Sequence, residues 1–177
     1  MHRLSVPLGI AAVVSLAFGV HEVTASTDYT LTESSRYSNG CFELCACPLA
    51  FSGVAGSLVV VPAGSDGSFE VFQIPSVKWN VPLPALQVSG SGTYRIDRNA
   101  RIQRLALDLR VGEQDVQHFD SGLVGATVDF PAIDALIAIH GAPACIDTRF
   151  EIRAVPEGLV AIEHAPWTVI KALYSRP

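Results

Sequence analysis

The sequence predicts an all-β protein, built as an antiparallel β-sandwich or a β-barrel of about 8–10 strands. Between Ser26 and Pro156 no amphipathic pattern of helical length occurs. Short stretches of alternating apolar and polar residues recur instead, and Gly, Pro, Asn and Asp separate them at short intervals. Sequential hairpins with one solvated face favour antiparallel pairing, but the composition does not distinguish a sandwich from a barrel.

The first 25 residues have the features of a signal peptide. Arg3 precedes an uncharged apolar run over residues 4–20, and Val23-Thr24-Ala25 places short side chains where signal peptidase requires them. We expect cleavage after Ala25, so that residues 26–177 form a single mature domain. The apolar run is at the short limit for crossing a bilayer. We therefore expect a secreted or periplasmic protein with no membrane span in the mature chain.

Composition excludes some classes of protein. Hydrophobic residues make up 49% of the 177 residues and charged residues only 16%, which excludes a disordered chain. The chain has 12 Lys and Arg against 17 Asp and Glu, a formal net charge of −5. A phosphate backbone would therefore meet net repulsion, so nucleic acid is not an expected partner.

Each strand is predicted from local alternation. In the hairpin over residues 93–111, Tyr94 and Ile96 share one phase, and the row from Leu105 to Val111 shares another, so both rows can line one core. Ile102 is out of phase with the leucine row, which indicates a bulge or a late strand start. The clearest predicted strands are 56–61, 69–74, 86–96, 105–111, 134–139 and 146–154, and weaker ones are 29–33, 77–81, 116–120 and 126–130.

Prolines and glycines mark the irregular places. Residues 81–85 contain two prolines. Proline has no backbone N–H to donate to a neighbouring strand, so this segment predicts a crossing between sheets. Residues 88–92 contain two glycines and predict a kinked or bulged strand start. After Pro156 the alternation weakens. Residues 166–174 have helical spacing behind a proline, which predicts one short C-terminal helix.

The four cysteines form an even set in an exported chain, which predicts two disulfides. They are Cys41, Cys45, Cys47 and Cys145. Cys45 and Cys47 would lie too far apart to bond on one face of a strand, so we favour one of them bonded to Cys145 and the other to Cys41. The alternative is a metal-binding protein that uses the four thiols for zinc or Cu(I), although C-x3-C-x-C is not a common zinc spacing.

One group of polar residues could carry acid–base chemistry. His118 and Asp120 share one face of a predicted strand, and a metal or hydrolytic site would need a third residue beside them. Asp120-Ser121-Gly122 matches the tripeptide of aspartic proteases, but it occurs once, and we favour a turn in which Asp120 caps backbone amides. No nucleophile elbow, phosphate loop or dinucleotide fingerprint occurs in the sequence.

Arginines concentrate on one predicted hairpin, which could bind a carboxylate, a sulfate or an acidic glycan. They are Arg95, Arg98, Arg101, Arg104 and Arg110. The interleaved Asp97 and Asp108 favour a solvated face with paired charges instead. We therefore expect an exported β domain with a binding or structural role, for an extracellular or periplasmic ligand or protein, without a cofactor, a resident metal or a catalytic constellation.

Overall fold

The computed structural model of the chain describes residues 25–41, 48–140 and 146–158. These residues form strands and turns and contain no helix. The strands are β1 (Thr27–Leu31), β2 (Arg36–Cys41), β3 (Ala50–Gly53), β4 (Ala55–Asp66), β5 (Phe69–Val81), β6 (Leu86–Asp97), β7 (Ile102–Val111), β8 (Gln117–Asp120), β9 (Val124–Gly125), β10 (Ile133–His140) and β11 (Ile146–Pro156).

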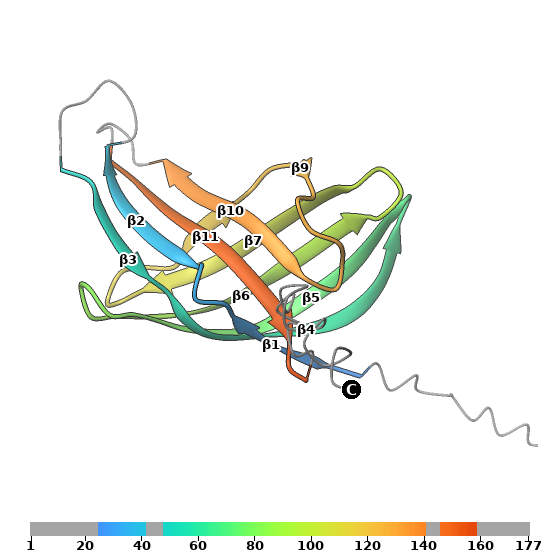
Figure 1. Cartoon of the computed structure of the whole chain (residues 1–177), viewed down its shortest axis with the longest axis horizontal. Helices are drawn as coiled ribbons and strands as arrows, with labels where there is room; N and C mark the ends of the chain where they lie inside the picture. The colour runs from blue at the N-terminus through green and yellow to red at the C-terminus, as the bar shows by residue number, and fades with distance from the viewer. Residues whose placement is uncertain (1–24, 42–47, 141–145, 159–177) are drawn as a thin grey trace, which may run out of the picture.

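All eleven strands belong to one antiparallel sheet that closes on itself (Figure 1). The path runs β1-β4-β5-β6-β7-β8-β10-β11, and β11 pairs again with β1. The result is a ring rather than a regular barrel, because β11 has two successive partners along one side. Its Ile146–Glu151 half pairs with β2 and its Ala154–Pro156 end pairs with β1. The predicted all-β antiparallel fold is confirmed.

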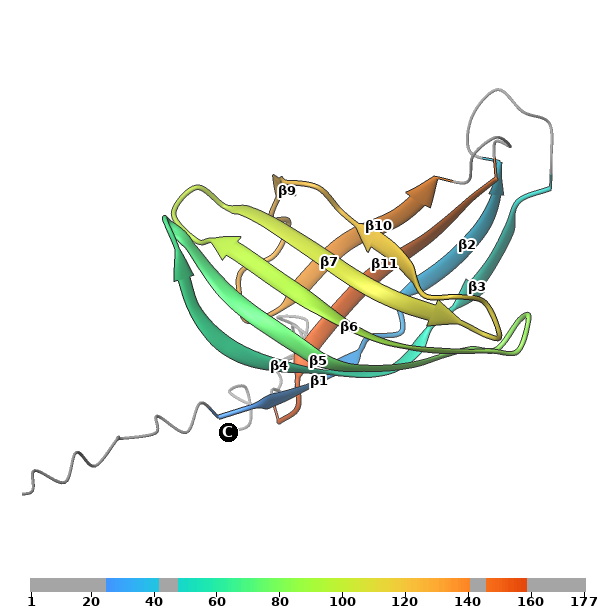
Figure 2. The same cartoon turned by 180° about the vertical axis from the view of Figure 1, so that it is seen from behind.

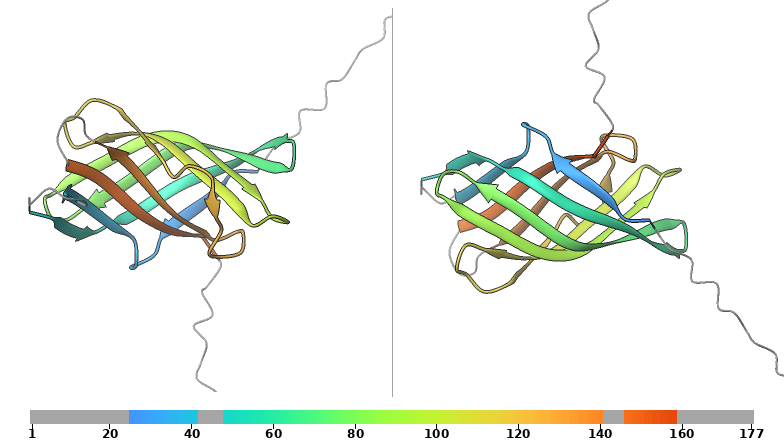
Figure 3. Two further views of the ribbon diagram at one scale, coloured as in Figure 1. Left: turned by 90° about the horizontal axis from the view of Figure 1, so that it is seen from above. Right: turned by 90° about the horizontal axis from the view of Figure 1, so that it is seen from below.

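The ring is elongated, and its strands slant across the long axis (Figures 2 and 3). The tips of the β4–β5 and β6–β7 hairpins lie at the same end of the ring (Figures 1 and 3). No helix in the described part of the chain is long and apolar enough to cross a membrane.

The inward faces of the strands are filled with side chains. Tyr94, Ile96 and the row from Leu105 to Val111 are buried, as the alternation predicts. Phe150 lies at the centre of an aromatic cluster, with ring centroids 5.2 Å from Tyr37, 5.6 Å from Trp79 and 5.4 Å from Phe119. Such aromatic contacts add to the free energy gained by burying apolar surface.

Two predicted irregularities take a different form in the structure. Residues 69–81 form one strand, β5, and not two, with a bulge between Ile74 and Val77 that faces Gly90 and Gly92 of β6. The prediction of a crossing between sheets at 81–85 is wrong. Val81 pairs with Leu86, so the two prolines lie in a turn that joins neighbouring strands of one sheet.

Three further details differ from the sequence prediction. Residues 126–130 form a turn region, not a strand, and β9 ends just before them. Strands β2 and β3 were not predicted, because their sequences alternate weakly. Ile102 causes no bulge, since the β6–β7 register is continuous, and Gln103 takes the inward position beside the leucine row. Residues 1–24 of the predicted leader at 1–25, and the predicted helix at 166–174, lie outside the described residues.

Candidate functional site

The ring is joined least extensively between β8 and β10. Strand β10 pairs with β11 along its whole length but with β8 only where Ala138 meets Asp120. Beyond that pair, β9 continues along β7 and makes no pair with β10. A buried side chain closes the gap instead, because the Gln103 Nε2 donates a hydrogen bond to the Asp134 carbonyl oxygen at 2.6 Å.

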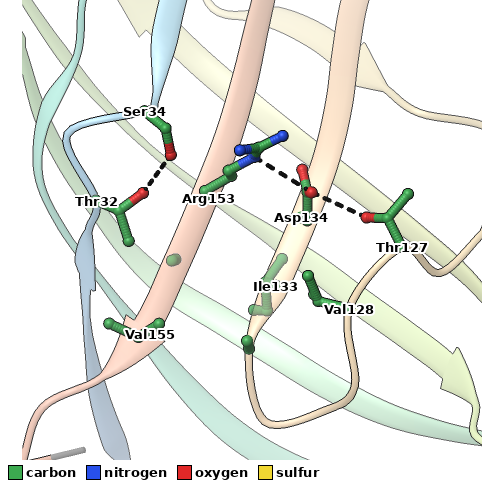
Figure 4. Close-up of a pocket in the computed structure, with 10 residues that line it drawn as sticks. Thr32, Ser34, Thr127, Val128, Ile133, Asp134, Arg153 and Val155 are labelled. Carbon is green, nitrogen blue, oxygen red and sulfur yellow. Dashed lines mark hydrogen bonds and ion pairs between the residues drawn. The ribbon is translucent and has the colours of Figure 1, made fainter. Parts of the chain in front are cut away.

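Two surface hollows flank this part of the ring. The larger, of about 530 Å³, extends from the β1–β2 turn across β11 and β10 to the segment between β9 and β10 (Figure 4). The second, of about 400 Å³, lies between β9 and β10 and reaches β11. Both volumes fall in the range typical of small-molecule sites. We call them the larger hollow and the smaller hollow.

A row of three polar side chains lines both hollows. Asp134 Oδ2 accepts a hydrogen bond from the Thr127 hydroxyl at 2.9 Å and lies 3.2 Å from Arg153 Nε. Figure 4 shows Arg153, Asp134 and Thr127 side by side, with Thr32 and Ser34 beyond β11. Asp134 and Arg153 are directly opposite each other in the β10–β11 register, so the sheet itself brings the two charges together.

The rest of the lining is mostly apolar and aliphatic. Val128, Ala132, Ile133, Ala154 and Val155 line the larger hollow. Val124, Ala135 and Leu136 line the smaller one, and Leu136 is 47% exposed. Concave apolar surface around a few placed polar groups is the usual composition of a ligand site.

The arginines of the predicted anion-binding hairpin are mostly paired with carboxylates. Arg95 pairs with Asp66, Arg98 with Glu70, Arg101 with Asp129 and Arg104 with Asp120. Among the described residues Arg110 makes no ion pair. Arg98 and Arg101 line a further hollow of about 210 Å³, where Arg98 lies 4.6 Å from the centroid of the Phe130 ring. Paired guanidinium groups offer little free charge to an incoming anion.

His118 and Asp120 do lie close together, and a second acid, Asp108, joins them. His118 Nδ1 is 2.8 Å from Asp108 Oδ1, and its Nε2 is 3.9 Å from Asp120 Oδ2. The cluster is on the outer face of β7 and β8, and the His118 side chain is 59% exposed. None of the three hollows described above includes it.

Asp120 acts as a structural carboxylate. It receives a bidentate contact from Arg104 and a backbone hydrogen bond from Gly122 at 2.8 Å. The Arg104 hydrogen bonds hold the pKa of Asp120 below its ordinary value. Ser121 donates to the Gly122 carbonyl and accepts from the Leu105 amide, so the Asp-Ser-Gly tripeptide forms a strand-end turn.

Cys41 ends β2 and is disulfide-bonded. Cys45, Cys47 and Cys145 lie outside the described residues, so the predicted pairing stays a prediction. A sulfur held in a disulfide is not a thiolate ligand for a metal. In the described ranges no group of three or more His, Cys, Asp or Glu side chains could hold a metal ion.

The sequence alone did not single out Asp134, Thr127, Arg153 or Gln103. The available signal was that Asp134 and Arg153 both fall in the polar phase of their strands. That signal becomes a pair only when the register of β10 against β11 is known. Comparisons with protein-family models, with curated proteins and with solved structures find no match to this chain.

Proposed function

We propose that this chain is an exported, non-catalytic binding domain, and that the two hollows beside the Thr127–Asp134–Arg153 row bind an uncharged amphipathic ligand. The leader-like residues 1–25 and the disulfide at Cys41 support export to an oxidising compartment. The observation that carries the binding proposal is the pair of adjoining hollows that share one polar row.

The electrostatics of the row favour a ligand without net charge. Asp134 and Arg153 neutralise each other, and Glu151 adds a negative charge to the lining of the smaller hollow. A buried anionic head group would find no free cation there, and a cationic one would find only the exposed Glu151 carboxylate, so either would lose more hydration free energy than it regains. A neutral group with a donor and an acceptor can instead bond to the row while its apolar part covers the aliphatic lining.

Three probes with one tail and different heads test this proposal: N-octylacetamide, octylammonium and octanoate. We expect amide resonances of Thr127, Asp134, Leu136 and Arg153 to shift on titration in ¹H–¹⁵N spectra. N-octylacetamide should bind most tightly and octanoate most weakly, because Glu151 and Asp134 repel an anion.

A substitution inside the larger hollow provides the matched test of location. Val155→Asp places a charge in the lining and should weaken N-octylacetamide binding about tenfold or more. Val59→Asp is the control, since Val59 is also a half-buried outward valine on a strand but lines neither hollow. Equal effects of the two variants, or tightest binding of octanoate, would contradict the proposal.

A further inference from the structure

We infer that the natural ligand of this site is an extended, uncharged peptide segment of a partner protein, which pairs with the free edge of β10. This inference rests on the proposed binding function and names its ligand class. Four observations carry it: the direction of the β10 backbone groups, the missing ladder beside them, the aliphatic lining and the neutral polar row.

The direction of the backbone groups follows from two hydrogen bonds. The Asp134 carbonyl accepts from Gln103 of β7, so it faces away from β11. The Arg153 carbonyl, opposite Asp134, accepts from the Thr32 amide and so faces β1, away from β10. Both observations place the backbone groups of Asp134 on the β8–β9 side of β10.

Strand periodicity extends this result to Leu136. Residues two apart in a strand direct their N–H and C=O to the same side, so the Leu136 groups face the smaller hollow. Ala138, two residues further, uses this side to pair with Asp120. In the described residues no backbone group pairs with Leu136 on this side. An exposed strand edge with a free donor and acceptor is a template for strand addition.

The side-chain environment selects the kind of peptide. Aliphatic residues line both hollows, and none of the described lining residues is aromatic, so these residues offer no stacking platform for a sugar. The hollows lie next to each other along β10 and β11, and an extended peptide projects alternate side chains every ~7 Å along one face. Short aliphatic side chains such as valine fit such lining. The neutral row disfavours a charged peptide.

The test uses the full chain and a blocked peptide, acetyl-Val-Thr-Val-Ser-Val-amide, followed in ¹H–¹⁵N spectra. Two analogues carry a single N-methyl group, one on the central valine and one on the neighbouring serine. We expect one of the two analogues to bind about tenfold more weakly than the parent and the other to bind equally, because only alternate amides face β10.

Leu136→Pro is the matching change in the protein. The Leu136 amide faces the hollow and not the β11 ladder, so proline removes the donor offered to the peptide while the β10–β11 ladder keeps its hydrogen bonds. Leu136→Val keeps the donor and serves as the control. We expect about tenfold weaker peptide binding to Leu136→Pro than to Leu136→Val, which loses part of the same leucine side chain but keeps the amide donor. Should Leu136→Pro fail to fold, the two N-methyl analogues test the same hydrogen bonds from the ligand side.

Each remaining outcome separates this inference from the proposal on which it rests. Equal binding of the parent peptide and both analogues would overturn strand pairing. Binding of N-octylacetamide without binding of the peptide would overturn the peptide inference and leave the binding function standing. Absence of binding by either probe would overturn both. Concentration-dependent shifts at Leu136 in the protein alone would identify a second copy of this chain as the occupant, and would also overturn the inference.

Discussion

Gln103 is the side chain that holds the open part of the ring together. It is 1% exposed, and it lies in a row that is otherwise apolar. Its Oε1 accepts a hydrogen bond from the buried Tyr94 hydroxyl at 2.9 Å, and its Nε2 donates to the Asp134 carbonyl. Burial raises the pKa of Tyr94 above its ordinary value, which keeps the hydroxyl proton available for this bond.

Replacement of Gln103 by leucine should destabilise the protein by about 2–4 kcal/mol, because it leaves the Tyr94 hydroxyl and the Asp134 carbonyl without partners. Urea unfolding followed by tryptophan fluorescence measures the change in the free energy of unfolding. Gln87→Leu is the control, since Gln87 is exposed and its side chain donates a hydrogen bond to the Asn80 side chain, and it should cost about 0.5 kcal/mol or less. A comparable loss of unfolding free energy in both variants would show that the buried hydrogen bonds of Gln103 contribute no more than those of an exposed side chain.

At the scale of single elements, β6 is shaped by two glycines. A Cβ on Gly92 would lie 2.1 Å from the Ala106 carbonyl oxygen and 2.8 Å from the Leu107 Cα. One on Gly90 would lie 2.1 Å from the Asp108 carbonyl oxygen. These close approaches occur where the bulge of β5 faces β6, so the missing side chains allow the sheet to curve there.

Gly92→Ala should therefore cost about 3 kcal/mol or more, since the backbone of β7 must move to accept the methyl group. Gly53→Ala is the matched control, because Gly53 is also in a strand and a Cβ there would meet nothing within 4 Å. Thermal unfolding of both variants measures the difference. A Gly92→Ala protein as stable as Gly53→Ala would mean that β6 can shift without loss of packing.

The strands that the sequence predicts well are those with a long apolar row on one side. β7 and β11 are examples, since Leu105, Leu107 and Leu109, and Phe150 and Ile152, are all buried. Strand β2 was missed because its Arg-Tyr-Ser-Asn-Gly-Cys sequence holds only one large apolar side chain, Tyr37. Its extended form depends on pairing with β11, a contact made far along the chain.

At the scale of the whole molecule, the local sequence patterns could not distinguish a sandwich from a barrel. Closure of the ring depends on β1 pairing with both β4 and β11, and these contacts join distant parts of the chain. The candidate site was equally out of reach, since Asp134 meets Arg153 only through the β10–β11 register and Thr127 only through the connection after β9. The arginines and His118 stand out in the sequence because charged and polar residues lie close together there. The hollows depend instead on the absence of pairing between β9 and β10, which only the fold shows.

The disulfide at Cys41 leads to a prediction about the oxidation state of the four cysteines in the intact chain. We expect no free thiol in the folded or denatured protein without reductant, and four after reduction, because all four cysteines should be oxidised in an exported protein. Thiol titration with a colorimetric reagent, together with elemental analysis, provides the measurement. Four thiols without reductant and a stoichiometric metal would instead support the metal-binding alternative.

In the described residues, Ala138 and Asp120 form the one pair that joins β8 to β10 and so closes the ring on this side. A ligand bound between β9 and β10 would contact both sides of this junction. Its binding free energy would therefore also stabilise the ring against opening there. Binding would then stabilise the closed ring as a whole, even though the ligand contacts only the strands beside this junction.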